Sequence, residues 1–250
     1  MAGHSKWANI RHRKGAQDAK RGKIFTKLVK EITVAVKVGG GADPEFNPRL
    51  RMAITNARGQ SMPKDNIERA IKKASGAGGE DYIETTFEGY GPDGVAIFVE
   101  CATDNNTRSV ANVRMHFRKN GGSMGKDGSL QFIFDHKGVF VLPLEGKDAD
   151  ELMMELIDAG GEDYEVEEDF MTVYTAMTDF GTVQKALQEL GIEPKEAGLQ
   201  RIPKVTKEVT EDNVATFMKL IDALEDDDDV QKVYHNAELS EEILAQYFGE

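Results

Sequence analysis

The sequence predicts an α+β protein, with an N-terminal three-helix domain followed by two ferredoxin-like α+β domains, one inserted in the other. Three observations lead to this fold class. Apolar residues recur at helical spacing as far as residue 74, and β-branched and aromatic residues alternate after residue 80. Residues 137–203 then show the element order βαββαβ between two incomplete α+β segments. The expected domains are 1–79, 80–136 with 204–250, and 137–203.

Three helices are expected in the N-terminal domain. The first, over residues 16–38, places an apolar stripe with Leu28, Ile32 and Ala35 on one face and a ridge of lysines on the other. The ridge consists of Lys20, Lys23, Lys27, Lys30 and Lys37. Three glycines end this helix, an Asn-Pro pair at 47–48 starts the second, and Pro63 starts the third.

The rest of the chain alternates predicted strands and helices. The first segment contains strands at 85–88, 95–99 and 130–134 with a helix at 106–119. The inserted segment contains strands at 138–142, 164–167, 170–176 and 199–202 with helices at 148–159 and 180–190. The last segment contains strands at 205–209 and 230–234 around a helix at 211–224. The first and last segments are each too small for a domain, so we expect them to combine.

Charge is divided unevenly along the chain. Residues 1–79 carry 17 basic and 6 acidic side chains, a net charge of +11. The other 171 residues carry 14 basic and 38 acidic side chains, a net charge of −24, which together give the chain's −13. Such asymmetry is typical of a polyanion-binding segment joined to an acidic body. The sequence therefore predicts a nucleic-acid partner for the N-terminal part.

Several classes of site and location are disfavoured by composition. Cys101 is the single cysteine, which excludes an internal disulfide, and no His/Cys cluster has zinc spacing. No apolar run approaches the roughly 18 residues of a membrane span, and the N-terminus lacks the apolar core of a secretory signal. We expect a cytoplasmic protein with no metal, no cofactor and no membrane partner.

Three motifs resemble ligand-binding loops. Residues 89–94 match G-x-G-x-x-G, but a strand follows where a dinucleotide site needs a helix, so a hairpin turn is predicted. Residues 121–126 resemble a phosphate loop, yet Asp127 stands where Ser or Thr is required, which favours a connection or a partner-contacting loop. The run at 226–229 lacks the spacing of a calcium loop and is interpreted as a solvated turn.

No combination of residues indicates catalysis. The five histidines are scattered, and no Ser or Cys nucleophile motif accompanies them. The sequence therefore predicts a non-enzymatic protein without catalytic residues and without a small-molecule substrate.

The candidate site consists of the basic arm at residues 1–14 and the lysine ridge. Its residues are Lys6, Trp7, Arg11, Arg13, Lys14, Lys20, Arg21, Lys23, Lys27 and Lys30. Basic side chains at helical spacing can neutralise phosphates and release counterions. Trp7 can stack on an unpaired base, or it can pin the arm to the helical domain. A solvated helix face is the alternative for the ridge, although only Glu31 lies among its five lysines.

Several long segments of the chain also resemble a known family. The segments MAGHSKWANIRHRKGAQDAKRGKIFTKL, MPKDNIERAIKKA and FEGYGPDGVAIFVECATDNNTRSVANVR are similar to those of the YebC/PmpR family of probable transcriptional regulators. The resemblance implies a three-domain α+β architecture, a cytoplasmic location and DNA-binding transcriptional control. It matches the family's basic opening at the candidate positions from Lys6 to Lys27. Related members, including the mitochondrial translational activator of cytochrome oxidase, act on the ribosome and assist synthesis through proline-rich stretches.

Two functions follow from these expectations. The first is a transcriptional regulator that binds duplex DNA through the basic helical domain, with transcription proteins as further partners. The alternative is a ribosome-associated translation factor that binds ribosomal RNA. Because no helix presents a clear set of Asn, Gln or Arg side chains to base edges, the sequence favours backbone binding over tight operator reading.

Overall fold

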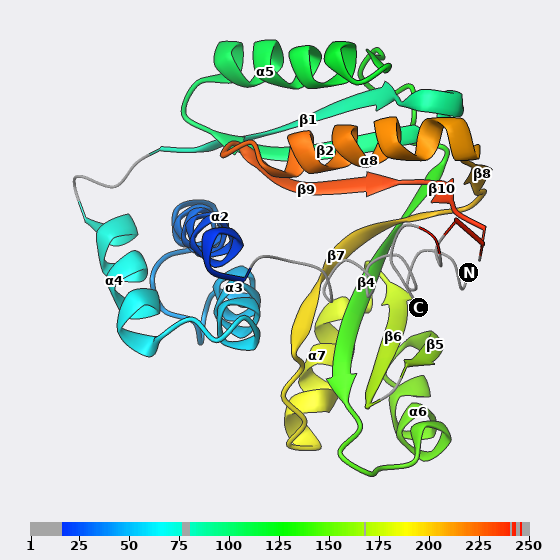
Figure 1. Cartoon of the computed structure of the whole chain (residues 1–250). Coiled ribbons are helices and arrows are strands. Elements are labelled where there is room, and N and C mark those ends of the chain that lie inside the picture. The colour runs from blue at the N-terminus through cyan, green and yellow to red at the C-terminus, as the bar shows by residue number, and fades with distance from the viewer. Residues whose placement is uncertain (1–16, 77–80, 168, 241, 244–245, 247–250) are drawn as a thin grey trace. The chain divides into compact units, whose positions relative to one another are not determined.

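The computed structural model describes residues 17–76, 81–167, 169–240, 242–243 and 246, with backbone alone for residues 17–21. It shows an α+β protein in which N-terminal helices precede two four-stranded sheets, as predicted (Figure 1). One compact unit contains α2 as far as Lys27, then Asp81–Asp135 and the chain from Ile202 onward. The other contains Leu28 through α4, and His136–Arg201. The three-domain division stays a prediction.

The N-terminal helices are α2 (Gln17–Val38), α3 (Pro48–Gly59) and α4 (Lys64–Ser75). Asn47 connects the first two. Its Oδ1 accepts a hydrogen bond from the Leu50 N–H, which caps α3, while its Nδ2 donates to the Ala35 carbonyl at 2.8 Å. The Asn-Pro pair therefore starts α3 as expected, and the same side chain holds the end of α2 against it.

Helix α2 is not simply two-faced. Ile32 and Ala35 are buried as predicted, but so are Thr33, Val34 and Val36, so this part of the helix is buried on all sides. Lys30, placed on the exposed ridge by its spacing, is only 8% exposed. The expectation of one apolar and one open face is therefore wrong for residues 32–36 and for Lys30.

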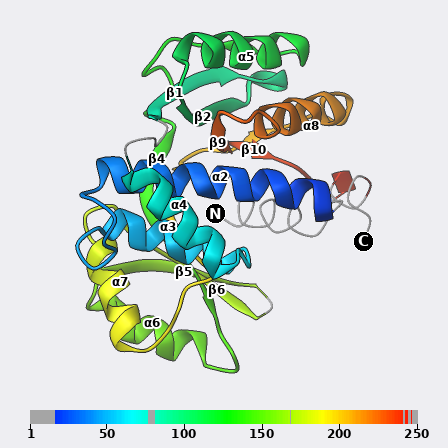
Figure 2. The ribbon, with the colours of Figure 1, turned by 90° about the vertical axis from the view of Figure 1, so that its left-hand side faces the viewer.

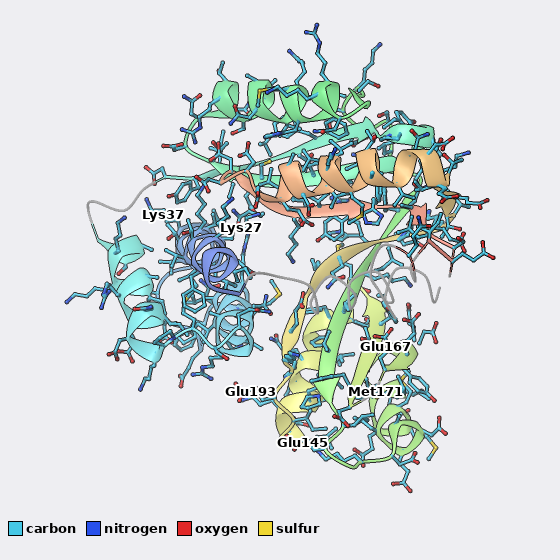
Figure 3. All side chains as sticks on the ribbon, in the orientation of Figure 1. Lys27, Lys37, Glu145, Glu167, Met171 and Glu193 are labelled. Carbon is cyan, nitrogen blue, oxygen red and sulfur yellow. The ribbon has the colours of Figure 1, made fainter. Side chains whose placement is uncertain are left out.

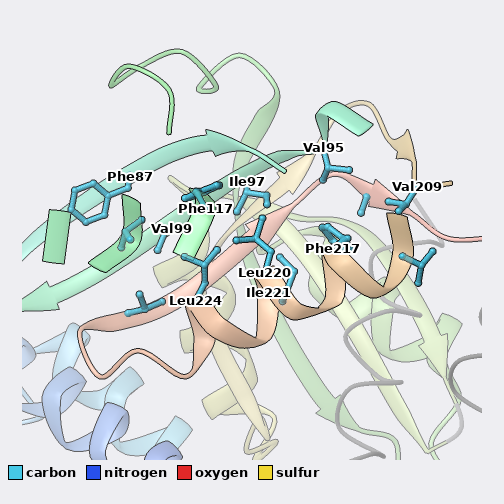
Figure 4. Packing of buried hydrophobic residues seen from close by; sticks show 14 of the residues in the cluster. Phe87, Val95, Ile97, Val99, Phe117, Val209, Phe217, Leu220, Ile221 and Leu224 are labelled. Atoms are coloured by element: carbon cyan, nitrogen blue, oxygen red, sulfur yellow. The ribbon is translucent and has the colours of Figure 1, made fainter. Parts of the chain in front are cut away.

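The first sheet combines strands from both ends of the acidic region. It contains β1 (Ile83–Tyr90), β2 (Ala96–Thr103), β3 (Ser123–Met124) and β9 (Val230–His235), in the order β3-β1-β2-β9. Helices α5 (Asn106–Lys119) and α8 (Glu211–Glu225) share one core with this sheet. Phe117 of α5 and Phe217 of α8 are fully buried in it, as Figure 4 shows.

Two predicted strands are wrong or shortened. Residues 130–133 form a turn, because the Leu130 N–H donates to the Glu88 carboxylate at 2.5 Å instead of to a neighbouring strand. Leu130 is still buried, against Phe98 and Phe134. The strand expected at 205–209 is reduced to β8 (Lys207–Glu208), which pairs in parallel with β10 (Ala237–Glu238).

The second sheet has the predicted βαββαβ order. It runs through β4 (Phe134–Pro143), α6 (Ala149–Ile157), β5 (Gly161–Glu167), β6 (Phe170–Ala176), α7 (Phe180–Glu189) and β7 (Glu196–Pro203). Its strand order, β5-β6-β4-β7, is that of a ferredoxin-like sheet. Leu156 of α6 and Val183 of α7 share a core with Phe140 of β4, and Figure 2 shows both helices beside this sheet.

Candidate nucleic-acid interface

Two lysines of the candidate site contact the end of helix α8. The Lys23 Nζ lies 3.0 Å from the Asp226 Oδ1, and the Lys27 Nζ donates a hydrogen bond to the Glu225 carbonyl at 2.6 Å. The last carbonyls of a helix carry partial negative charge and attract cations. The α8 terminus and Asp226 therefore engage Lys23 and Lys27, two lysines of the candidate site.

The structure describes only part of the remaining candidate site. Lys6, Trp7, Arg11, Arg13 and Lys14 lie outside the described residues. Lys20 and Arg21 belong to α2, but only their backbone is described. Lys30 is buried, whereas Lys37, labelled on α2 together with Lys27 in Figure 3, is exposed. Among the described candidates, the structure thus brings together Lys23 and Lys27, and the site as a whole stays a proposal.

The acidic run at 226–229 is not a simple solvated turn. The Asp229 carboxylate is 3% exposed and receives hydrogen bonds from the Arg108 Nε at 3.0 Å, the Arg108 Nη2 at 2.8 Å and the Ser109 Oγ at 2.9 Å. The Asp227 Oδ2 lies 3.1 Å from the His116 Nε2. Hydrogen bonding to Asp229, with a further bond to Asp104, raises the pKa of Arg108. The turn therefore joins α5 to the α8–β9 connection.

Helix α5 carries cations that the sequence interpretation overlooked. Arg114, Arg118 and Lys119 are exposed, and within the described part of the chain none of them has a hydrogen bond or an ion pair. A signal was present in the sequence, because residues 105–126 contain five basic and no acidic side chains within the acidic body. Averaging the charge over the whole body concealed it.

The G-x-G-x-x-G match forms the turn between β1 and β2, as predicted. A Cβ on Gly89 would stand 2.7 Å from the Phe117 ring, so this glycine permits close packing of α5. Asp93, with φ 58°, accepts hydrogen bonds from the Thr210 N–H and the Asn213 Nδ2. Burial opposes ionisation of Asp93, but these bonds outweigh it and lower its pKa. The motif thus organises packing and the start of α8.

The glycine-rich segment after α5 is held by a buried carboxylate. Glu88 of β1 is 2% exposed, and its side chain accepts hydrogen bonds from the Gly128 N–H at 2.9 Å and from the Leu130 N–H. The Ser129 Oγ also donates to it, and the Gly125 N–H donates to the Glu88 carbonyl at 2.7 Å. Glu88 therefore engages several donors between residues 125 and 130, which accounts for a fixed connection from β3 to β4.

Neither a metal cluster nor a membrane-spanning helix is found among the described residues. No group of three or more His, Cys, Asp or Glu side chains there is arranged to hold a metal ion. Of the helices that the structure describes, none has the length and apolarity needed to cross a membrane.

Two family models match consecutive parts of the chain. The model described as the TACO1/YebC protein N-terminal domain matches residues 5–77, and the model described as the TACO1/YebC second and third domain matches residues 82–237. The chain belongs to the TACO1/YebC family. Membership confirms the resemblance seen in the sequence and agrees with the helical start and the sheets that follow it.

Relatives of known sequence and structure extend over nearly the full length of this TACO1/YebC chain. A "Probable transcriptional regulatory protein" from Syntrophotalea carbinolica is 54% identical over 250 residues, covering 100% of both chains. One with the same description from Amoebophilus asiaticus is 54% identical over 239 residues, covering 94% of this chain and 98% of the relative. The crystal structure of a conserved hypothetical protein from Aquifex aeolicus superposes with a TM-score of 0.81 at 41% identity, covering 92% and 96% of the two chains.

Proposed function

We propose that the chain is a non-enzymatic transcriptional regulator that binds duplex DNA through its basic N-terminal part. The observation that carries this proposal is the net charge of +11 on residues 1–79, joined to a body of net charge −24. The names of the TACO1/YebC relatives support a regulatory role in transcription. The candidate contacts are those of the arm and of α2, from Lys6 to Lys30.

Phosphates have to compete with an aspartate at Lys23 and with a backbone carbonyl at Lys27. Both side chains of the Lys23–Asp226 pair are exposed. Exposed ion pairs stabilise a protein by only about 0–1 kcal/mol. A polyanion that releases condensed counterions can replace such a contact. Lys30 is buried, so Lys23, Lys27 and the arm carry most of the proposed binding.

A ribosome-associated translation factor is the second candidate. One feature favours it, because the basic segment offers lysines and arginines without a matching set of Asn or Gln side chains on the same helix face. Such a surface recognises phosphates and shape, which ribosomal RNA supplies as well as duplex DNA does. Ribosomal or transcription proteins would then contact the acidic body.

DNA titration and ribosome co-sedimentation, each across a salt series, separate the two candidates. On the DNA hypothesis, the logarithm of the binding constant falls by roughly 0.9 per unit of log salt for each phosphate contact. The double variant Lys23→Glu/Lys27→Glu should weaken binding to every duplex sequence alike and lower that slope by roughly 2. The milder Lys23→Gln/Lys27→Gln pair guards against misfolding beside Glu225, with circular dichroism as the check.

The matched control is Lys185→Glu/Lys219→Glu, which makes the same charge change on exposed lysines of α7 and α8. If both double variants weakened binding equally, net charge would explain the effect and the assigned surface would be rejected. Retention on ribosomes at salt concentrations that release duplex DNA would favour the translation factor.

A further inference from the structure

Helix α5 and the segment after it form a basic island in the acidic body. Only 14 basic side chains follow residue 79, and five of them fall within residues 105–126. None of the 38 acidic side chains of this region lies in that stretch of 22 residues. A solvated helix face normally mixes charges of both signs, so this stretch departs from the usual pattern.

Helix α5 holds exposed cations outside the core. Val113 and Phe117 are fully buried in the core with the first sheet, which fixes the rotation of α5. At about 100° per residue, Arg118 and Lys119 fall on the side away from that core, and Arg114 falls beside it. All three are exposed, in agreement with this arrangement.

The cations nearer the acidic turn already have partners. Arg108 binds Asp229 and Asp104, and His116 lies beside Asp227. By contrast, Arg114, Arg118 and Lys119 have no hydrogen bond or ion pair with any described residue. The body thus contains carboxylates in excess, yet leaves these three cations open.

The open side of α5 is also firmly supported. Asn105 caps the helix by accepting a hydrogen bond from the Arg108 N–H, and the Arg108–Asp229 contact ties its first turn to the α8–β9 connection. Phe117 anchors its last turn in the core. Arg114 and Arg118, one helical turn apart, are therefore carried on a rigid support, which lowers the ordering cost of binding.

We propose that Arg114, Arg118 and Lys119 form a second phosphate-binding surface, which contacts the sugar-phosphate backbone of a nucleic acid. The proposal rests on the proposed function for the kind of polymer, and it adds a contact outside the N-terminal part. One guanidinium group can bind two oxygens of a phosphate at the same time. Two of the three side chains are arginines. The exposed large apolar side chain on α5 is Met115, which is 41% exposed. A single such side chain provides too little apolar area for the centre of a protein–protein interface.

The test compares two triple variants of the full chain. Arg114→Glu/Arg118→Glu/Lys119→Glu reverses the proposed surface, and Lys147→Glu/Lys185→Glu/Lys219→Glu makes the same charge change on exposed lysines elsewhere in the body. Fluorescence anisotropy follows binding to a mixed-sequence duplex DNA, and to the RNA duplex of the same sequence, across a salt series. Circular dichroism checks folding, and the triple Arg/Lys→Gln variant repeats the measurement with half the charge change.

The α5 variant should bind about ten-fold or more weakly at low salt, and its salt slope should fall by up to about 2.7 for three DNA phosphate contacts. The control variant should change far less. A larger loss on DNA than on RNA, or the reverse, identifies the polymer that α5 contacts. If both triple variants behaved alike while Lys23→Glu/Lys27→Glu weakened binding, the α5 surface would be refuted and the proposed function retained. If the unaltered protein bound neither polymer, both proposals would be overturned.

Discussion

Asp93 shows how one side chain connects two segments that are distant in the sequence. It sits in the turn before β2 and accepts hydrogen bonds from Thr210 and Asn213 at the start of α8. Its positive φ of 58° suits Asp, Asn or Gly better than other residues. We expect Asp93→Ala to lower the free energy of unfolding by about 1 kcal/mol, measured by urea denaturation.

The same carboxylate predicts a pH dependence. Because the pKa of Asp93 is lowered in the folded protein, its ionised form stabilises the fold above its unfolded pKa of about 3.9. That contribution is lost as the pH falls through the lower folded value. The difference in unfolding free energy between the unaltered protein and Asp93→Asn should therefore shrink below about pH 4. A difference that stayed constant with pH would contradict this role for the charge.

Asp226 is expected to restrain binding by Lys23. Asp226→Asn removes the charge that lies 3.0 Å from the Lys23 Nζ and leaves that lysine, among the described residues, with only the carbonyl of residue 226 at 3.5 Å, so a phosphate meets less competition. Since an exposed pair contributes about 0–1 kcal/mol, affinity for duplex DNA should rise by up to about five-fold. Asp222→Asn, an exposed change of equal charge on α8, is the control. Equal gains from both variants would attribute the effect to net charge.

Single residues also mark the limit of prediction from this sequence. Asn47, Ile32 and Ala35 are predictable, because local capping and helical spacing decide their positions. Asp229 is not, because it pairs with Arg108, which is distant in the sequence, and the burial of Lys30 does not follow from its spacing either. Leu130 is apolar and buried, which is typical of a strand residue. Its backbone N–H instead donates a hydrogen bond to the Glu88 carboxylate.

At the scale of elements, two glycines should respond in opposite directions to alanine. In Gly89→Ala the new methyl would meet the Phe117 ring and the Ser123 carbonyl, each at 2.7 Å, so we expect a loss of about 1–3 kcal/mol. Gly181 lies in α7, where an added methyl group would have no atom within 4 Å, so Gly181→Ala should stabilise by about 0.5–1 kcal/mol. Thermal denaturation measures both, and a stable Gly89→Ala variant would refute the close approach of α5.

The elements themselves are predictable where the pattern is local and strong. The βαββαβ segment follows from alternating strands and amphipathic helices, and the structure reproduces its order and its sheet topology. Sequence patterns miss the short strands β3 and β10 and predict β8 too long. A strand of two residues is defined by the strand it pairs with, and its own composition carries little signal. The middle of α2 loses its expected open face for a similar reason, because contacts on all sides override spacing.

At the scale of the whole molecule, charge distribution predicts more about function than composition does. The pI of about 4.9 describes neither the basic N-terminal part nor the basic island on α5. The first is predictable from the sequence because it lies at one end of the chain. The second is short and surrounded by acidic segments, so the fold was needed to show which of its cations are open and which are paired with Asp229 and Asp227.

The interrupted first sheet has a consequence for how the protein is made. Strands β1 and β2 are synthesised early, but their neighbour β9 and the covering helix α8 follow only after β7. A nascent chain can therefore complete the β4–β7 sheet while Phe87, Val99 and Phe117 still lack the side chains of Phe217 and Leu220. Until α8 and β9 have been synthesised, the exposed apolar side chains of this incomplete core can cause aggregation. Folding of the first sheet is therefore completed only when these two elements emerge.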